Sequence, residues 1–233
     1  MEAYKGNSLV NLQRSLEIIS RYPSQVIVLK GTKEIIPLTY KPLKRIRTNI
    51  VDYEQTESFP EFCSTIYSLN PQEANAQYRE LQAKSREANA FFVDKLQYAS
   101  KILEAIALTE QGYSQDELHQ IRRKQTYSAE LLDKIIRSIM TVTAMLLSRT
   151  GLPNKGFSLV KNCYLFRYTA ACFFLSTKWI SEGGYQSIEV QKFQNDVIDM
   201  SYTTYATYFD GLLTKDKKIK EIHKLLEVFI RYL

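Results

Sequence analysis

Residues 195–216 read NDVIDMSYTTYATYFDGLLTKD, and the predicted fold depends on this stretch. Apolar and aromatic residues recur at helical spacing up to Tyr208, which indicates a helix over 187–208. Residues 209–214 (FDGLLT) suit a short buried strand, and residues 217–232 place apolar side chains on one face, as an amphipathic helix does. Helix, strand, acidic turn and helix in this order are typical of an α/β protein.

Helical patterns dominate the rest of the chain. Apolar spacing predicts helices over 8–21 and 159–181, while the β-branched run QVIVLK at 25–30 predicts a second strand. With 8 Gly and 6 Pro in 233 residues, the chain has too few turn formers for a sandwich or a barrel. The predicted fold class is therefore α/β and helix-dominated, with a small, mainly parallel sheet.

A long antiparallel helical hairpin is predicted in the middle of the chain. Residues 72–108 contain neither Gly nor Pro, and Ser114 with Glu117 forms a capping box that starts a second helix. The hairpin is longer than a compact α/β core requires, so it is predicted to be an insertion. The predicted division is an α/β core of residues 1–69 and 150–233 with an inserted hairpin of residues 70–149.

Three late aspartates are the candidate catalytic and metal-binding residues. Asp196 and Asp199 are three positions apart and share one face of a helix, while Asp216 follows the predicted strand. If that strand lies beside the helix, the three carboxylates converge at the carboxyl end of the sheet. Mg²⁺ and Mn²⁺ prefer such oxygen ligands, and together with substrate phosphates they support phosphodiester hydrolysis.

This stretch resembles the PIN-like nuclease superfamily. The residues that carry the resemblance are Asn195-Asp196, Asp199, Asp210-Gly211 and Thr214-Lys215-Asp216. The resemblance implies that Asp196 or Asp199 binds the metal together with Asp216, and that Thr214 hydrogen-bonds nearby. It also implies a nuclease in which Mg²⁺ or Mn²⁺ activates water for attack on phosphorus, with RNA favoured over DNA as substrate.

The first strand departs from the family pattern, because Lys30 stands where the family has an aspartate. A cationic ammonium among carboxylates competes with a divalent cation. Either another carboxylate completes the site, or the site binds metal weakly or not at all. The candidate replacements are Glu34, Asp52, Glu54, Glu57 and Glu61.

A structural interpretation stands beside the catalytic one. Asp196 and Asp199 could form the solvated face of a helix, and Asp216 could be the N-cap of the last helix. The chain would then be a non-catalytic binding protein that uses its hairpin to dimerise or to hold a partner. An all-helical regulator is a third alternative.

Basic clusters and a net charge of +6 favour an anionic partner. The predicted nucleic-acid-binding residues are Lys44, Arg45, Arg47, Lys215, Lys217 and Lys218. The start of the chain lacks the pattern of an export signal, and Lys161 and Arg167 interrupt the most apolar stretch, which argues against a membrane span. The three cysteines are widely spaced. A cytoplasmic location is therefore predicted.

Overall fold

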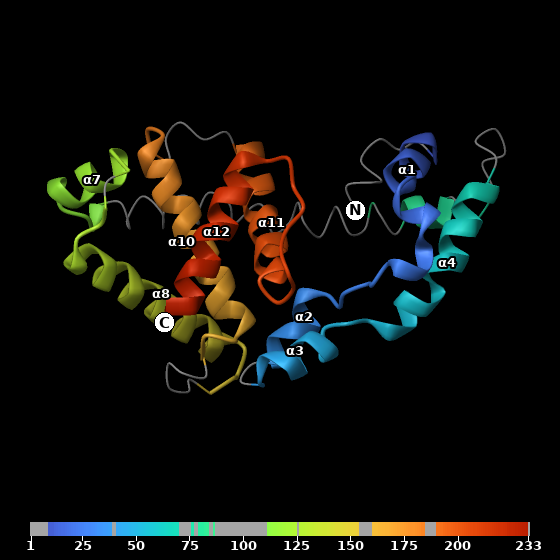
Figure 1. Ribbon diagram of the computed structural model, residues 1–233, viewed down its shortest axis with the longest axis horizontal. Helices are drawn as coiled ribbons and strands as arrows, with labels where there is room; N and C mark the ends of the chain where they lie inside the picture. The colour runs from blue at the N-terminus through green and yellow to red at the C-terminus, as the bar shows by residue number, and fades with distance from the viewer. Residues whose placement is uncertain are drawn as a thin grey trace. The chain divides into compact units, whose positions relative to one another are not determined.

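The computed structural model describes residues 9–38, 41–69, 76, 79–83, 86, 111–124, 126–153, 160–184 and 190–232. Over these residues all of the regular secondary structure is helical (Figure 1). Among them, none is long and apolar enough to cross a membrane. The helices are α1 (Leu9–Leu16), η2 (Ile19–Arg21), η3 (Pro23–Gln25), α2 (Thr32–Ile35), η4 (Ile36–Leu38), α3 (Leu43–Asn49), α4 (Tyr53–Ser68), α7 (Gln115–Arg122), α8 (Ala129–Arg149), α10 (Tyr164–Ser181), α11 (Val190–Ala206) and α12 (Lys217–Tyr232).

The predicted α/β fold with a parallel sheet is wrong for the described part of the chain. In the predicted strand at 25–30, Gln25 is the last residue of η3, and the N–H of Lys30 donates to the carbonyl of Ile50 at 2.8 Å. The N–H of Asp52 donates to the carbonyl of Val28, also at 2.8 Å. These contacts make an isolated antiparallel bridge and no sheet, because α4 begins directly after Asp52.

The second predicted strand, 209–214, is also wrong. The chain turns after α11, and residues 211–214 have no regular structure. Gly211 adopts a φ of 150°, and the side chain of Leu213 is fully exposed instead of buried. A short apolar run between two helices is compatible with a strand or a loop. Here it forms the loop that leads into α12.

The chain divides into two compact units, and the first comprises Met1–Lys30 and Ile50–Tyr98. Its described core lies between α1 and α4 and consists of Leu9, Leu12, Leu16, Ile66 and Leu69, with Phe62 and Leu81 packed against it. The hydroxyl of Tyr67 donates to the carbonyl of Gln13 at 2.6 Å and joins the same helices. Pro60 lies inside α4, which begins at the Asp52 cap.

The second unit comprises Gly31–Asn49 and Ala99–Leu233, and α10 is its central helix. Because the sequence of α10 is apolar almost all round, the helix can be buried on several sides. It packs against α7, α8, α11 and α12 (Figure 1). The predicted second hairpin helix is two helices, since Lys124 turns the chain with a φ of 52° and Ser128 caps α8. Most of 70–110 lies outside the described residues, so the predicted insertion stays a prediction.

A buried arginine fixes one end of α10. The side chain of Arg167 is 2% exposed, and its guanidinium lies 4.3 Å from the ring centroid of Tyr208. Its N–H groups donate to the carbonyls of Lys161 at 3.0 Å and Thr207 at 2.8 Å, and to the side-chain oxygen of Asn162 at 3.2 Å. All of these acceptors are neutral. Burial lowers the pKa of Arg167 from its usual value.

Candidate functional site

The side chain of Asp196 on α11 forms buried polar contacts with residues of α10 and α12. It is 3% exposed on α11, so the alternative interpretation that placed it on a solvated face is wrong. One carboxylate oxygen accepts a hydrogen bond from the indole N–H of Trp179 on α10 at 3.2 Å. The other accepts from the ammonium of Lys218 on α12. We call Asp196, Trp179 and Lys218 the polar triad. Lys218 was predicted to contact nucleic acid, and here its ammonium pairs with Asp196.

Asp216 caps α12. Its carboxylate accepts from the backbone N–H of Lys218 at 2.7 Å and of Ile219 at 3.1 Å. The hydroxyl of Thr214 in turn accepts from the backbone N–H of Asp216 at 3.1 Å. Such bonds satisfy N–H groups that the first turn of a helix leaves without partners. The capping role that the sequence offered as an alternative is therefore confirmed.

Two of the three predicted aspartates, Asp196 and Asp216, contact the same residue, Lys218. Asp196 bonds the side chain of Lys218, and Asp216 bonds its backbone. Asp199 lies one turn further along α11 and is half-buried, while Asn195 and Asp210 are exposed. Over the described residues, no group of three His, Cys, Asp or Glu is placed to hold a metal ion. With the ammonium of Lys218 on Asp196, a divalent cation would have to displace a bound cation, so the Mg²⁺ or Mn²⁺ site stays a prediction.

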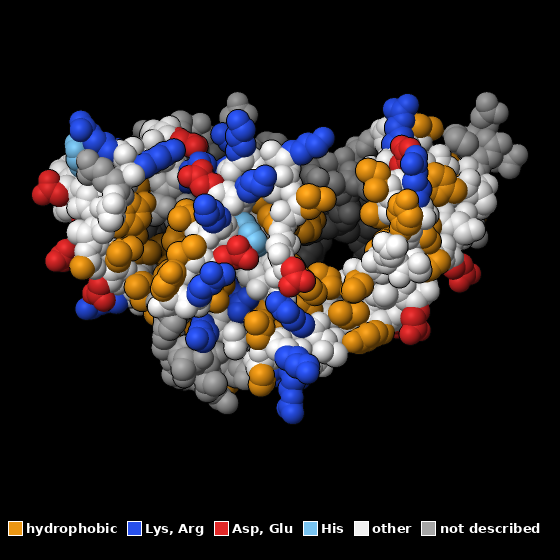
Figure 2. All heavy atoms as spheres, viewed as in Figure 1, with side chains coloured by type: hydrophobic (Ala, Val, Ile, Leu, Met, Phe, Trp, Pro, Cys, Tyr) orange, Lys and Arg blue, Asp and Glu red, His pale blue; other side chains and the backbone are white. Residues whose placement is uncertain are grey.

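The predicted basic residues are mostly on the surface. Lys44, Arg45 and Arg47 are exposed on α3, and Lys215 and Lys217 are exposed near the start of α12. No described carboxylate forms an ion pair with any of these five side chains. Figure 2 shows Lys and Arg side chains over the part of the second unit that α12 and α3 occupy.

The charge of the chain is divided unequally between the units. The second unit contains 23 Lys or Arg against 15 Asp or Glu, a net charge of +8, whereas the first contains 8 against 10, a net charge of −2. The electrostatic attraction of an anionic partner therefore falls on the second unit.

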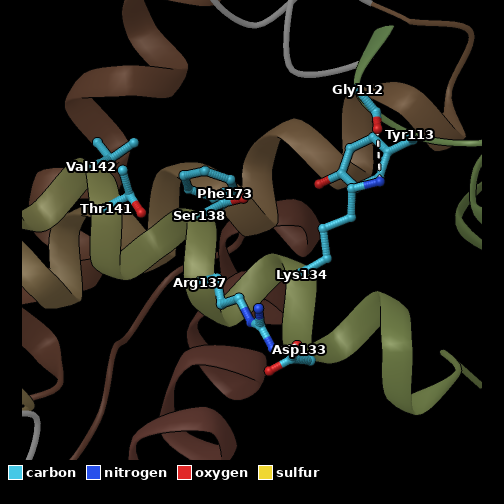
Figure 3. A pocket seen from close by; sticks show the side chains of 9 residues that line it. All are labelled: Gly112, Tyr113, Asp133, Lys134, Arg137, Ser138, Thr141, Val142 and Phe173. Atoms are coloured by element: carbon cyan, nitrogen blue, oxygen red, sulfur yellow. Dashed lines mark hydrogen bonds and ion pairs between the residues drawn. The ribbon is translucent and has the colours of Figure 1, made fainter.

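One hollow of about 490 Å³ lies between the start of α7, α8 and α10 (Figure 3). The ammonium of Lys134 donates to the carbonyl of Gly112 and to the carboxylate of Glu117, both at 2.7 Å. The hydrogen bond from Lys134 lowers the pKa of Glu117. Burial, with smaller contributions from nearby acidic groups, raises the pKa of Tyr113 to about 12. These groups are partners of one another and hold the start of α7 onto α8.

A larger and mostly apolar groove of about 640 Å³ lies between α8, α10 and α12. We call it the α12 groove. Its apolar residues include Leu132, Ile136, Phe174, Leu225, Val228 and Phe229. Leu132, Leu225 and Val228 remain 46%, 47% and 45% exposed, respectively. The groove therefore exposes apolar side chains to solvent, and all of its lining residues belong to the second unit.

The sequence prediction missed Trp179, Arg167 and the α12 groove. Trp179 and Arg167 lie in an apolar stretch that the sequence marked only as a buried helix. The groove had a readable signal, because Leu225, Val228 and Tyr232 repeat at i, i+3 and i+7 beside the face that packs into the core. No family model, no curated protein and no solved structure matches the chain. The resemblance to PIN-like nucleases stays a prediction.

Proposed function

We propose that the protein binds nucleic acid, and that α3 holds the phosphate backbone of single-stranded RNA. The observation that carries the proposal is the exposure of Lys44, Arg45 and Arg47 on one short helix, with no described carboxylate paired to them. Lysine and arginine side chains that contact phosphates release condensed counterions, which supplies most of the sequence-independent affinity for nucleic acid.

The surroundings of α3 add to its positive potential. The buried guanidinium of Arg167 has neutral hydrogen-bond acceptors, so its charge is not cancelled by the groups it bonds. After burial, the charges that act on its pKa include that of Arg47, which lowers it further. A buried charge is screened less by salt than an exposed one. The charge of Arg167 therefore adds to the positive potential near Arg47.

Anisotropy of a fluorescein-labelled single-stranded RNA, titrated with the full chain at several salt concentrations, tests this proposal. We expect the triple variant Lys44→Glu, Arg45→Glu, Arg47→Glu to lose at least tenfold in affinity. We also expect the slope of log K against log salt to fall by about two, because each phosphate contact on a single strand contributes about 0.7.

A matched triple variant controls for net charge. Arg14→Glu, Arg149→Glu and Lys192→Glu change three exposed cations on other helices by the same total charge. We expect the control to lose less than threefold in affinity. Equal losses in the two triple variants, or no binding by the unchanged protein, would contradict the role of α3.

Hydrolysis of the bound strand is a second candidate, favoured by the meeting of Asp196 and Asp216 at Lys218. Its requirement is that Lys218 leaves Asp196 when Mg²⁺ or Mn²⁺ and substrate phosphates arrive, so that carboxylate oxygens hold the metal. We expect Mn²⁺-dependent cleavage of single-stranded RNA by the unchanged protein and none by Asp216→Asn, which still caps the helix. Asp210→Asn is the exposed control. Equal cleavage by all three proteins would remove the catalytic assignment, while RNA binding would stand.

A further inference from the structure

The α12 groove has the shape and composition of a helix-binding surface. Its floor is α10, and its walls are α8 and α12, all within one unit. Three apolar side chains on these walls are nearly half exposed, which leaves apolar area in contact with water. Grooves of this kind bind amphipathic helices through apolar residues at i, i+3, i+4 and i+7. We propose that this groove binds an acidic amphipathic helix of a partner protein.

The charge of the partner helix follows from the solvent-facing flank of α12. At about 100° per residue, the flank next to the groove face carries four cations, with Glu227 at its far edge beside His223. The four cations are Lys217, Lys220, Lys224 and Arg231, all exposed. A helix lying in the groove places its own flank beside these cations, where glutamate or aspartate is attracted and lysine is repelled.

The lining of the groove has the same bias. Lys124 at the end of α7 and Lys178 on α10 line it, together with one acid, Glu221. The ammonium of Lys178 bonds the carboxylate of Glu221 at 2.6 Å, so this acid is already neutralised within the protein. Lys124 is exposed and has no described ion-pair partner. The excess charge at the lip of the groove is therefore positive.

A second copy of the chain is a poorer occupant for electrostatic reasons. In a twofold dimer the same patch is present on both sides of the interface. Pairing two α12 grooves would place four cations of each copy near those of the other. Like charges brought together in this way oppose association. An acidic helix from another protein meets the same apolar surface with a favourable charge.

Three labelled model peptides of about 18 residues, or five helical turns, test the proposal by fluorescence anisotropy with the full chain. The first carries leucines at i, i+3, i+4 and i+7 with glutamates elsewhere. The second replaces every glutamate by lysine. The third has the composition of the first, but its leucines are shuffled so that no apolar stripe forms. We expect the first to bind at least tenfold more tightly than either of the others.

Variants in the groove locate the binding. Leu225→Asp and Val228→Asp should each weaken binding of the acidic peptide at least tenfold. Met145→Asp is the matched control, because Met145 is 51% exposed on α8, does not line the groove and receives the same added charge. We expect this control to change affinity less than twofold. Circular dichroism of each variant checks that the fold is retained.

Three results would overturn the inference. The first is equal binding of the acidic and shuffled peptides, which would indicate attraction to net charge alone. The second is equal weakening by Met145→Asp and Leu225→Asp, which would place binding elsewhere. The third is a concentration-dependent dimer in analytical ultracentrifugation that Leu225→Asp abolishes, which would make a second copy the occupant of the groove.

Discussion

The two ends of α12 use their surfaces in opposite ways. At the first turn, Lys218 donates to buried Asp196, and Asp216 caps the helix, so the polar groups have partners inside the protein. In the second half, Leu225 and Val228 stay nearly half exposed over a groove. In the described contacts, Asp196 and Asp216 of the acidic motif thus hold α12 in place. The exposed apolar surface comes instead from the amphipathic part of the helix.

The first way to break this comparison is to remove the carboxylate of the polar triad. Asp196→Ala should lower the free energy of unfolding by about 3–5 kcal/mol, because it leaves the ammonium of Lys218 without its buried partner. It also removes the acceptor of the Trp179 N–H. Urea denaturation followed by tryptophan fluorescence measures the change. Asp210→Asn, an exposed control, should change stability by less than about 0.5 kcal/mol. A loss below about 1 kcal/mol in Asp196→Ala would contradict the buried ion pair.

Two adjacent leucines sharpen the comparison within the second half of α12. Leu226 is 0% exposed, whereas Leu225 is 47% exposed. Leu226→Ala should destabilise by about 2–4 kcal/mol, since it removes buried methyl groups and leaves a cavity. Leu225→Ala should cost less than about 0.5 kcal/mol. Thermal unfolding of both variants measures the difference, and similar losses would mean that the groove is closed in solution.

The cap of α12 predicts a smaller effect. Asp216→Ala should lower stability by about 1 kcal/mol, because two backbone N–H groups lose their acceptor. Asp216→Asn should be nearly neutral, since asparagine caps as well as aspartate. Chemical denaturation at neutral pH measures both variants. Equal losses in the two would assign the effect to the charge rather than to the hydrogen bonds.

The smallest effect on stability is expected at the ion pair between Lys178 on α10 and Glu221 on α12. The hydrogen bond from Lys178 lowers the pKa of Glu221, so the folded state favours the ionised carboxylate. Its stabilisation is present above the unfolded pKa and is lost as the pH falls through the folded pKa. Because Glu221 is half exposed, Glu221→Gln should cost less than about 1 kcal/mol at pH 7. The difference between variant and unchanged protein should be constant near neutral pH and should shrink as the pH falls below the unfolded value of about 4.3.

The sequence predicted α12 well, and the reasons are local. Residues 217–232 were predicted and are observed as α12, because the amphipathic pattern is strong and Asp216 supplies a cap at the start. Which side of the apolar face of α12 is buried depends on the helices that pack against it. The amphipathic pattern of residues 217–232 does not distinguish Leu225 from Leu226, yet in the structure Leu226 is buried and Leu225 is exposed.

The predictions that failed depend on contacts between distant segments. FDGLLT at 209–214 was assigned to a strand from its composition, but a strand needs a neighbour, and none is present among the described residues. The alternative that placed Asp196 on a solvated face is wrong, because its side chain is buried and accepts a hydrogen bond from Trp179 on another helix. Neither partner can be found from the spacing of residues along one helix.

Arg167 has a consequence for how the second unit opens. Its guanidinium joins the residues before α10 to Thr207 in the turn after α11. Fraying of either segment would leave N–H groups of the buried Arg167 without hydrogen-bond acceptors, which is unfavourable. The two helix ends therefore form one cooperative unit. Amide protons near Arg167 and near Thr207 should exchange with deuterium at a common rate, although these two residues are 40 positions apart in the chain.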